Sequence, residues 1–455
     1  MSSYICRICG NLSFAVKSPN ETIRMVLEDL LAETGTKDTP CRTCRFLWQA
    51  ISEITEGDTV HPEITYTSFD ISPAEHGDRI GKGPLHGHLV PNPALGAKAA
   101  TPVDLQFYTL PTDPPSPWTT IGRGYHITPN GLSDSCVSLL RSWLALCTTS
   151  QGKHTRCSTP PTPSLPTRLV HVGTATEHPR LYLTKPHEKS RFAALSHCWG
   201  GASPVRTLNR NIEDHFMALP LSSLPQTFAD AIAVTRAMGL EFLWIDSLCI
   251  IQDDLQDWER EAARMAHVYA NAWVTISADA ATDADKGFLG PPSRMVPAYK
   301  SIPVTAPDGG DGHALERTVH VRKRGFLAEE LPFHYWSVPT AGLRSGQVSG
   351  RSKLATRGWV FQERILSPRT VHFSQHEMAW ECRSVCDCEC SATSARTLRT
   401  TSVVKHFLDH SGDGGTTDSI VPKRATWRRD IVPAYTRLEL TVPTDRLAAL
   451  ASLKL

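Results

Sequence analysis

The chain has 455 residues, of which 40% are hydrophobic and 20% charged, as in soluble globular proteins, and this length suggests two or three domains. Its 47 basic residues balance 46 acidic ones, which argues against a general nucleic-acid binder. The start has no apolar run of signal-peptide length, and no stretch of about 18 uncharged apolar residues occurs anywhere, so we expect a cytoplasmic protein that does not bind or span a membrane.

Two pairs of cysteines with C-x2-C spacing lie near the start, Cys6 with Cys9 and Cys41 with Cys44. In a reducing compartment such pairs indicate metal ligands or redox thiols more than structural disulfides. Their spacing suits a tetrahedral zinc site, although the gap between the pairs is longer than in common zinc ribbons. Reduced structural thiols are the alternative. The sequence thus predicts a candidate zinc site and leaves that alternative open.

Helices are predicted near Thr22–Glu33, Phe46–Ile54 and Leu139–Leu146. Residues 58–117 are rich in glycine, proline and histidine, so we expect loops there. The segment STPPTPSLP at Ser158–Pro166 predicts an extended, exposed connector, and we place the main domain boundary at this point.

Strands and helices alternate after this connector. Strands are predicted at Arg191–Cys198, Phe242–Ile245 and Trp273–Ala278. Helices are predicted at Leu224–Met238 and from Asp254 to about Tyr269, and either Asp253 or Asp254 can cap the second helix. This alternation predicts an α/β fold with a mainly parallel sheet and flanking helices. Ligands bind such sheets beyond the carboxyl ends of the strands.

Periodicity is lost after Gly287 and returns near Thr356, and residues 307–350 look like an insertion. The segment Arg357–Arg369 then predicts a helix, and Thr370–Cys382 a strand or hairpin. A second cysteine cluster follows and consists of Cys382, Cys386, Cys388 and Cys390. The prediction of metal or redox chemistry at this cluster rests on composition alone.

Four segments, in this order, carry a family resemblance: FAALSHCWGG at Phe192–Gly201, a long block at Phe242–Ala278, RGWVFQERILSPR at Arg357–Arg369, and HFSQHEMAWEC ending at Cys382. Together they resemble the heterokaryon-incompatibility (HET) domain of filamentous fungi. The resemblance suggests four regions: an N-terminal part at 1–157, a connector and lead-in strand at 158–190, the HET domain at 191–366 with an insertion at about 295–355, and a C-terminal extension at 367–455. Two interpretations of this extension are open, a short member of the family and a truncated one.

The resemblance implies an intracellular effector that triggers or regulates programmed cell death after recognition of non-self. The family has also been proposed to be distantly similar to the Toll/interleukin receptor (TIR) domain, and some TIR domains hydrolyse NAD with a glutamate on a helix soon after a tryptophan. This implies an NAD(+) glycohydrolase acting on a nucleotide substrate. The alternative is a non-enzymatic module that acts by self-association or by recruiting other incompatibility proteins.

Glu261 is the candidate catalytic residue, and Trp258 lies on the same helix. With Trp258 at zero and about 100° per residue, Glu261 falls at about −60°, inside the apolar stripe that contains Met265. An inward carboxylate needs partners or a raised pKa. In one interpretation, Glu261 is a structural residue bonded to an arginine or to backbone amides. In the other, it is a catalytic group at the sheet edge, and Trp258 is a binding residue of the same site.

The other candidate binding residues are Ser196, Trp199, Gly200 and Asp246, because all lie at the expected carboxyl edge of the sheet. Asp246 could contact a ribose or cap the following turn, and Trp199 with Gly200 could form a turn or stack on a flat ligand. We expect Cys198 and Cys249 to be packing residues.

Glu363 lies four residues after Trp359 on the predicted helix, so the two side chains share a face. A buried salt bridge or cap is one interpretation, and a second wall of the pocket is the other. No Gly-rich dinucleotide fingerprint or P-loop occurs, which disfavours a dehydrogenase or an NTPase.

Overall fold

The structure is a computed structural model of the chain. It describes residues 5–13, 22–35, 41–57, 61–72, 83–98, 102–149, 154, 157, 163–200, 205–306, 315–324, 352–390, 427–440 and 445–451. The chain divides into two compact units. The first unit comprises Met1–Ile127, Val296–Leu327 and Cys390–Ser394, and the second comprises Thr128–Met295, Ala328–Glu389 and Ala395–Leu455. No helix in the described ranges is long and apolar enough to cross a bilayer.

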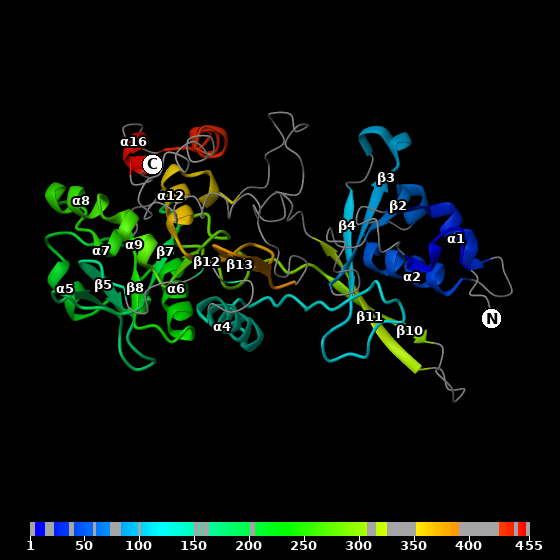
Figure 1. Ribbon diagram of the computed structural model, residues 1–455, viewed down its shortest axis with the longest axis horizontal. Helices are drawn as coiled ribbons and strands as arrows, with labels where there is room; N and C mark the ends of the chain where they lie inside the picture. The colour runs from blue at the N-terminus through cyan, green and yellow to red at the C-terminus, as the bar shows by residue number, and fades with distance from the viewer. Residues whose placement is uncertain are drawn as a thin grey trace, which may run out of the picture. The chain divides into compact units, whose positions relative to one another are not determined.

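The second unit is built on an eight-stranded sheet with the order β14-β13-β12-β9-β7-β8-β5-β6 (Figure 1). Its strands are β5 (Arg168–His171), β6 (Arg180–Leu183), β7 (Phe192–Ser196), β8 (Phe242–Trp244), β9 (Val274–Ser277), β12 (Arg369–Phe373), β13 (Met378–Cys382) and β14 (Cys386–Cys388). Every residue of β7, β8 and β9 is buried, so both faces of the sheet centre are covered.

The three strands predicted from the alternating pattern lie in this one sheet and pair in parallel, with β7 between β8 and β9. Strand β12 adds a further parallel pairing beside β9. The β5–β6 and β12–β13–β14 connections are antiparallel, as is the β5–β8 pair. The sheet is therefore mixed, and the prediction of a mainly parallel sheet is not confirmed. Short connections explain the β5–β6 and β12–β13–β14 pairings, because strands joined by a short turn pair antiparallel.

Helices α5 to α9 lie between the parallel strands β7, β8 and β9 in the sequence, as the alternation predicted. The helices of the second unit are α4 (Asp134–Thr148), α5 (Ile212–Met217), α6 (Gln226–Ala237), α7 (Asp246–Cys249), α8 (Leu255–Ala262), α9 (Met265–Asn271), α12 (Gly358–Leu366), α15 (Val432–Thr436) and α16 (Asp445–Ala451). Helix α12 packs on α9, and the two lie side by side in Figure 1. Thus α12, far along the chain, covers the same region as the helices after β8.

One local prediction in this unit needs correction. Asp246, which follows the predicted strand, begins the one-turn helix α7. The single helix expected from Asp254 to Tyr269 is two helices, α8 and α9. The amide of Arg264 bonds to the carbonyl of Glu261, three residues back, which tightens the last turn of α8 before α9 starts.

The first unit is an antiparallel six-stranded sheet with the order β1-β2-β3-β4-β11-β10. Its strands are β1 (Ile23–Val26), β2 (Tyr66–Ser72), β3 (Leu85–Pro91), β4 (Val103–Tyr108), β10 (Tyr299–Ala306) and β11 (Leu315–Arg324), and its helices α1 (Leu27–Gly35), α2 (Arg42–Thr55) and α3 (Pro62–Thr65). The prediction of loops over residues 58–117 was wrong, since three of these strands lie there. Glycine and proline at the turns and the polar outer faces concealed the alternating buried positions, such as Leu85 and Leu89.

The predicted insertion also contributes to the first unit. Strands β10 and β11 both come from the segment Val296–Leu327, and β11 pairs with β4. The parts of the predicted insertion at residues 307–314 and 325–351 lie outside the described residues.

Candidate functional site

A cavity of about 620 Å³ lies in the second unit at the carboxyl ends of β7 and β8. This is the edge at which α/β sheets bind ligands, and the volume falls in the range of small-molecule sites. We call it the strand-end cavity. It is lined by Cys198, Trp199, Gly200, Asp246, Ile250, Gln252, Trp258, Ala262, Met265, Lys353, Thr356, Arg357, Gly358, Trp359, Glu363, Glu439, Leu440 and Asp445. Residues far apart in the sequence thus form one site.

Asp246 is held firmly at the mouth of this cavity. Its Oδ1 accepts a hydrogen bond from the Ser247 amide at 2.7 Å, and its Oδ2 accepts one from Trp199 Nε1 at 2.8 Å. The ring nitrogen Nε2 of His197 lies 3.9 Å from Oδ1. The structure therefore brings Asp246 and Trp199 together, as the sequence predicted, and orients the indole through its N–H.

Gly200 has a backbone φ of +81°, in the left-handed region that favours glycine. A Cβ at this position would lie 2.5 Å from Cβ of Asp283. Only glycine fits this turn after β7, and the turn presents Trp199 to the cavity. Ser196, the last residue of β7, is buried and does not line the cavity.

Glu363 is the buried carboxyl group of the strand-end cavity. It projects from α12, and its Oε2 has no hydrogen-bond partner. Burial, together with the charge of Asp246, raises the pKa of Glu363 from 4.5 to about 7, although contributions from Ser196, Arg357 and Tyr269 oppose the shift. A carboxyl group that titrates near neutral pH can hold or release a proton, which suits acid–base catalysis.

The walls of the cavity combine two cationic side chains, four acidic ones and three indole rings. Arg357 donates from Nη1 to the carbonyl of His197 at 2.7 Å, which fixes the guanidinium against the chain after β7. Trp359 donates from Nε1 to Asp445 Oδ2 at 3.2 Å, and Trp258 is 37% exposed. Positive charge beside indole rings suits a ligand that has both phosphate and a flat heterocycle.

Glu261 does not line the strand-end cavity, contrary to our expectation. Its side chain is buried, and its Oε1 accepts hydrogen bonds from Thr167 Oγ1 at 2.8 Å and Arg260 Nε at 3.3 Å. Nη1 of Arg264 lies 3.6 Å from the same oxygen. The buried face of α8 is thus the acidic one, while Leu255 is 70% exposed, so the geometry fits the structural interpretation of Glu261.

The missed residues are Glu363 as the buried acid and Arg357 as a cation at the site. The spacing of Trp359 and Glu363 on one helix face was a usable signal, and it favours the interpretation of Glu363 as a pocket wall. Nothing in the sequence placed Glu439 and Asp445 near β7, because that proximity depends on the tertiary fold. Cys249 is buried, and burial raises its pKa to about 12, as expected for a packing thiol.

The four N-terminal cysteines converge in the first unit as the zinc hypothesis requires. Their sulfurs lie within 4.8 Å of one another, with Cys6 to Cys44 at 3.7 Å and Cys9 to Cys41 at 3.6 Å. Hydrogen bonds from Cys44 and Cys9 lower the pKa of Cys41, which precedes the first residue of α2 and so faces a helix N-terminus. This cluster can hold a metal ion.

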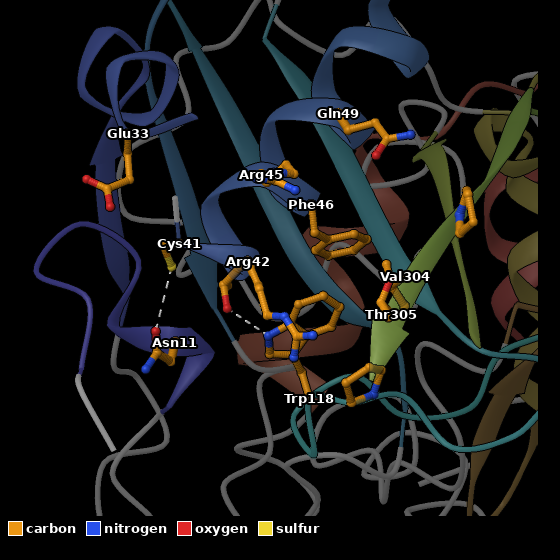
Figure 2. Close-up of a pocket in the computed structure, with 13 residues that line it drawn as sticks. Asn11, Glu33, Cys41, Arg42, Arg45, Phe46, Gln49, Trp118, Val304 and Thr305 are labelled. Carbon is orange, nitrogen blue, oxygen red and sulfur yellow. Dashed lines mark hydrogen bonds between the residues drawn. The ribbon is translucent and has the colours of Figure 1, made fainter. Parts of the chain in front are cut away.

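Cys41 also borders a second cavity, of about 980 Å³, within the first unit (Figure 2). Phe46 and Trp118 stack in its wall with ring centroids 4.4 Å apart, and Trp118 Nε1 donates to Thr43 Oγ1 at 2.9 Å. Arg42 lines this cavity as well.

Comparison with known proteins finds a family match for the region that contains most residues of the strand-end cavity. Residues 192–363 match the family profile described as Heterokaryon incompatibility protein (HET). No curated protein and no solved structure gives a significant match to the chain. The matched range begins at the first residue of β7 and ends at Glu363, so it includes the parallel strands β7, β8 and β9. Residues 192–363 of the chain therefore match a heterokaryon incompatibility domain.

Proposed function

We propose that this protein is a cytoplasmic cell-death effector of the heterokaryon-incompatibility type, and that its strand-end cavity binds and hydrolyses NAD or a related nucleotide. The observation that carries the proposal is Glu363, a buried carboxyl group of near-neutral pKa in a cavity with cationic and indole walls. Glu363 takes the catalytic role first considered for Glu261, because Glu363 reaches the cavity and Glu261 does not.

Each wall of the cavity has a function in this proposal. Lys353 and Arg357 attract the phosphates, while Trp199 or Trp258 stacks on the nicotinamide or adenine ring. Asp246 accepts a hydrogen bond from a ribose hydroxyl, since its carboxylate is fixed by Ser247 and Trp199 and remains partly exposed.

The proposed reaction breaks the bond between the nicotinamide nitrogen and the ribose carbon. The electron pair leaves with nicotinamide, and water adds to the ribose carbon. Glu363 as carboxylate stabilises the positive charge that develops on the ribose and accepts the proton that the water loses. The products are nicotinamide, ADP-ribose and a proton.

The test is NAD consumption by the purified full-length protein. Glu363→Gln keeps the shape and removes the titrating group, so we expect the rate to fall on the order of a hundred-fold or more. Glu259→Gln, an identical change at an exposed position on α8, is the matched control and should retain the rate. A Glu363→Gln protein that consumes NAD at the native rate would refute the catalytic role.

A non-enzymatic role is the second candidate. Leu255 and Trp258 are exposed on α8, and exposed apolar side chains can mediate self-association or binding of another incompatibility protein. If the wild-type protein kills cells without consuming nucleotide, and Leu255→Ser abolishes killing, this role replaces the enzymatic one.

We also propose that the N-terminal cysteine cluster binds zinc. Four convergent thiols suit the tetrahedral geometry of a closed structural site, in which all four ligands come from the protein. Elemental analysis of a Cys6→Ser/Cys9→Ser variant should show one zinc fewer per chain than the wild type. Equal metal content would exclude this site.

A further inference from the structure

A second cluster of potential metal ligands lies in the second unit, away from the strand-end cavity. Its members are Cys147, His154, Cys157 and Cys382. Cys147 lies in the last turn of α4, His154 and Cys157 lie between α4 and β5, and Cys382 ends β13. The three thiols are reduced and buried. The fold thus brings together His154 and Cys382, which are more than 200 positions apart in the sequence.

The distances match those of a tetrahedral site. One ligand atom from each of the four residues lies within 4.8 Å of all the others. Nδ1 of His154 is 3.8 Å from Cys157 Sγ and 3.6 Å from Cys382 Sγ. A tetrahedron with Zn–S bonds near 2.3 Å has sulfur–sulfur edges of about 3.8 Å. The ligand atoms therefore surround a space of the size that zinc requires.

Polar and charged groups surround the sulfurs of the cluster. The amide of Val385 donates to Cys382 Sγ at 3.3 Å, and that sulfur donates to the Val385 carbonyl at 3.4 Å. Cys157 Sγ donates to Ser384 Oγ at 3.3 Å. The buried Arg369 donates from Nε to Cys147 Sγ at 3.2 Å and from Nη2 to the carbonyl of Cys157 at 2.9 Å. Hydrogen bonds and positive charge at the sulfurs are features of the outer shell of metal sites.

The charge of the site also balances. Zinc with three thiolates and a neutral imidazole carries a net charge of −1, and the adjacent guanidinium of Arg369 supplies +1. A buried site of this kind avoids the cost of an uncompensated charge. A single disulfide would use only two of the three thiols and would leave both His154 and the third thiol without a function in the cluster.

We propose that Cys147, His154, Cys157 and Cys382 bind a structural zinc ion. All four positions are filled by the protein, so the site is closed and has no open coordination position for catalysis. Its function is structural, because the zinc ion cross-links α4 and the segment that precedes β5 to the end of β13. This site is independent of the proposed nucleotide chemistry.

The first experiment measures zinc in the purified full-length protein in which Cys6→Ser and Cys9→Ser remove the N-terminal cluster. We expect about one zinc per chain to remain. X-ray absorption at the zinc edge should show three sulfur ligands and one nitrogen ligand. A folded protein that contains no zinc, or one whose mass under non-reducing conditions shows a disulfide among these cysteines, would overturn the proposal.

The second experiment uses substitutions in that same background. His154→Ala and Cys382→Ser should each lose the remaining zinc, whereas His154→Cys should retain it with four sulfur ligands. Cys136→Ser changes another buried thiol of α4 that lies outside the cluster, so it should retain the metal. If the cysteine variants fail to fold, His154→Ala still decides, because a folded His154→Ala protein that retains the zinc would exclude His154 as a ligand.

Discussion

Two buried glutamates in the second unit differ in how their charge is compensated. Glu261 receives hydrogen bonds from Thr167 and Arg260 and has Arg264 nearby, so its carboxylate is stabilised in the fold. Glu363 has an oxygen without a partner, and its pKa is raised by burial. The contacts of Glu261 stabilise the protein, whereas Glu363 remains able to exchange a proton near neutral pH.

The raised pKa of Glu363 predicts a pH-dependent stability difference. Between 4.5 and about 7 the folded protein holds a proton that the unfolded chain has lost, so the stabilisation is present below pH 4.5 and is lost as the pH rises through 7. The shift corresponds to about 3 kcal/mol. Glu363→Gln should therefore unfold with a higher free energy than the wild type at pH 8 and nearly the same one at pH 4.5. Urea titrations at both pH values measure this, and an identical difference at both would contradict the raised pKa.

Glu261→Gln should affect stability more than chemistry. The substitution removes the charge that Arg260 and Arg264 face, and we expect a loss of about 1–3 kcal/mol in the free energy of unfolding. The rate of NAD consumption per folded molecule should not change, because Glu261 does not reach the strand-end cavity. A large rate loss with unchanged stability would restore Glu261 as the catalytic residue.

At the scale of elements, α8 owes its position to its ends and to one buried ion pair. Asp254 caps the helix by accepting from the amides of Gln256 and Asp257 at 3.0 and 3.1 Å. The carboxylate of Asp257 is buried and pairs with the buried Arg168 of β5. The helix is thereby tied to the sheet while Trp258 remains at the cavity.

Asp254→Ala should destabilise the protein by about 1 kcal/mol, because the first turn of α8 loses its cap. Asp254→Asn should cost less, since its amide oxygen can accept the same hydrogen bonds. Chemical unfolding of the two variants tests this. Equal losses for Ala and Asn would show that the cap contributes nothing at this helix.

At the scale of the whole molecule, each unit has its own sheet and its own cluster of potential metal ligands. The cluster of the first unit is Cys6, Cys9, Cys41 and Cys44, and that of the second is Cys147, His154, Cys157 and Cys382. The first unit is assembled from segments on both sides of β5–β9 in the sequence. Cross-linking by metal is useful where non-local segments must be held together, because bound zinc adds its binding free energy to folding.

Removal of zinc should therefore lower the thermal stability of the full-length protein. If free zinc exceeds its dissociation constant about a hundred-fold, each site contributes about 3 kcal/mol, and a chelator removes this contribution. Calorimetry with and without a chelator measures the shift, and re-addition of zinc should reverse it. No shift in the wild type would mean that neither cluster holds metal under those conditions.

The sequence by itself determined the features that depend on local pattern. The alternation around Phe192, Phe242 and Val274 predicted three parallel strands, and the segments that match the HET family predicted the domain. The convergence of Cys6, Cys9, Cys41 and Cys44 was predicted from spacing and chemistry alone. Each of these signals lies within a short stretch of chain or in the residue type itself.

Tertiary structure decided the rest, because burial depends on which segments meet. The mixed character of the sheet follows from hairpins at its edges, and the strands of the first unit were hidden by glycine and proline at their ends. The helix-wheel position of Glu261 showed that it faces inward, but not that Thr167 and Arg260 satisfy it there. Likewise, the pKa of Glu363 rises chiefly because its carboxyl group is buried where α12 packs on α9, which no pattern within Gly358–Leu366 could specify.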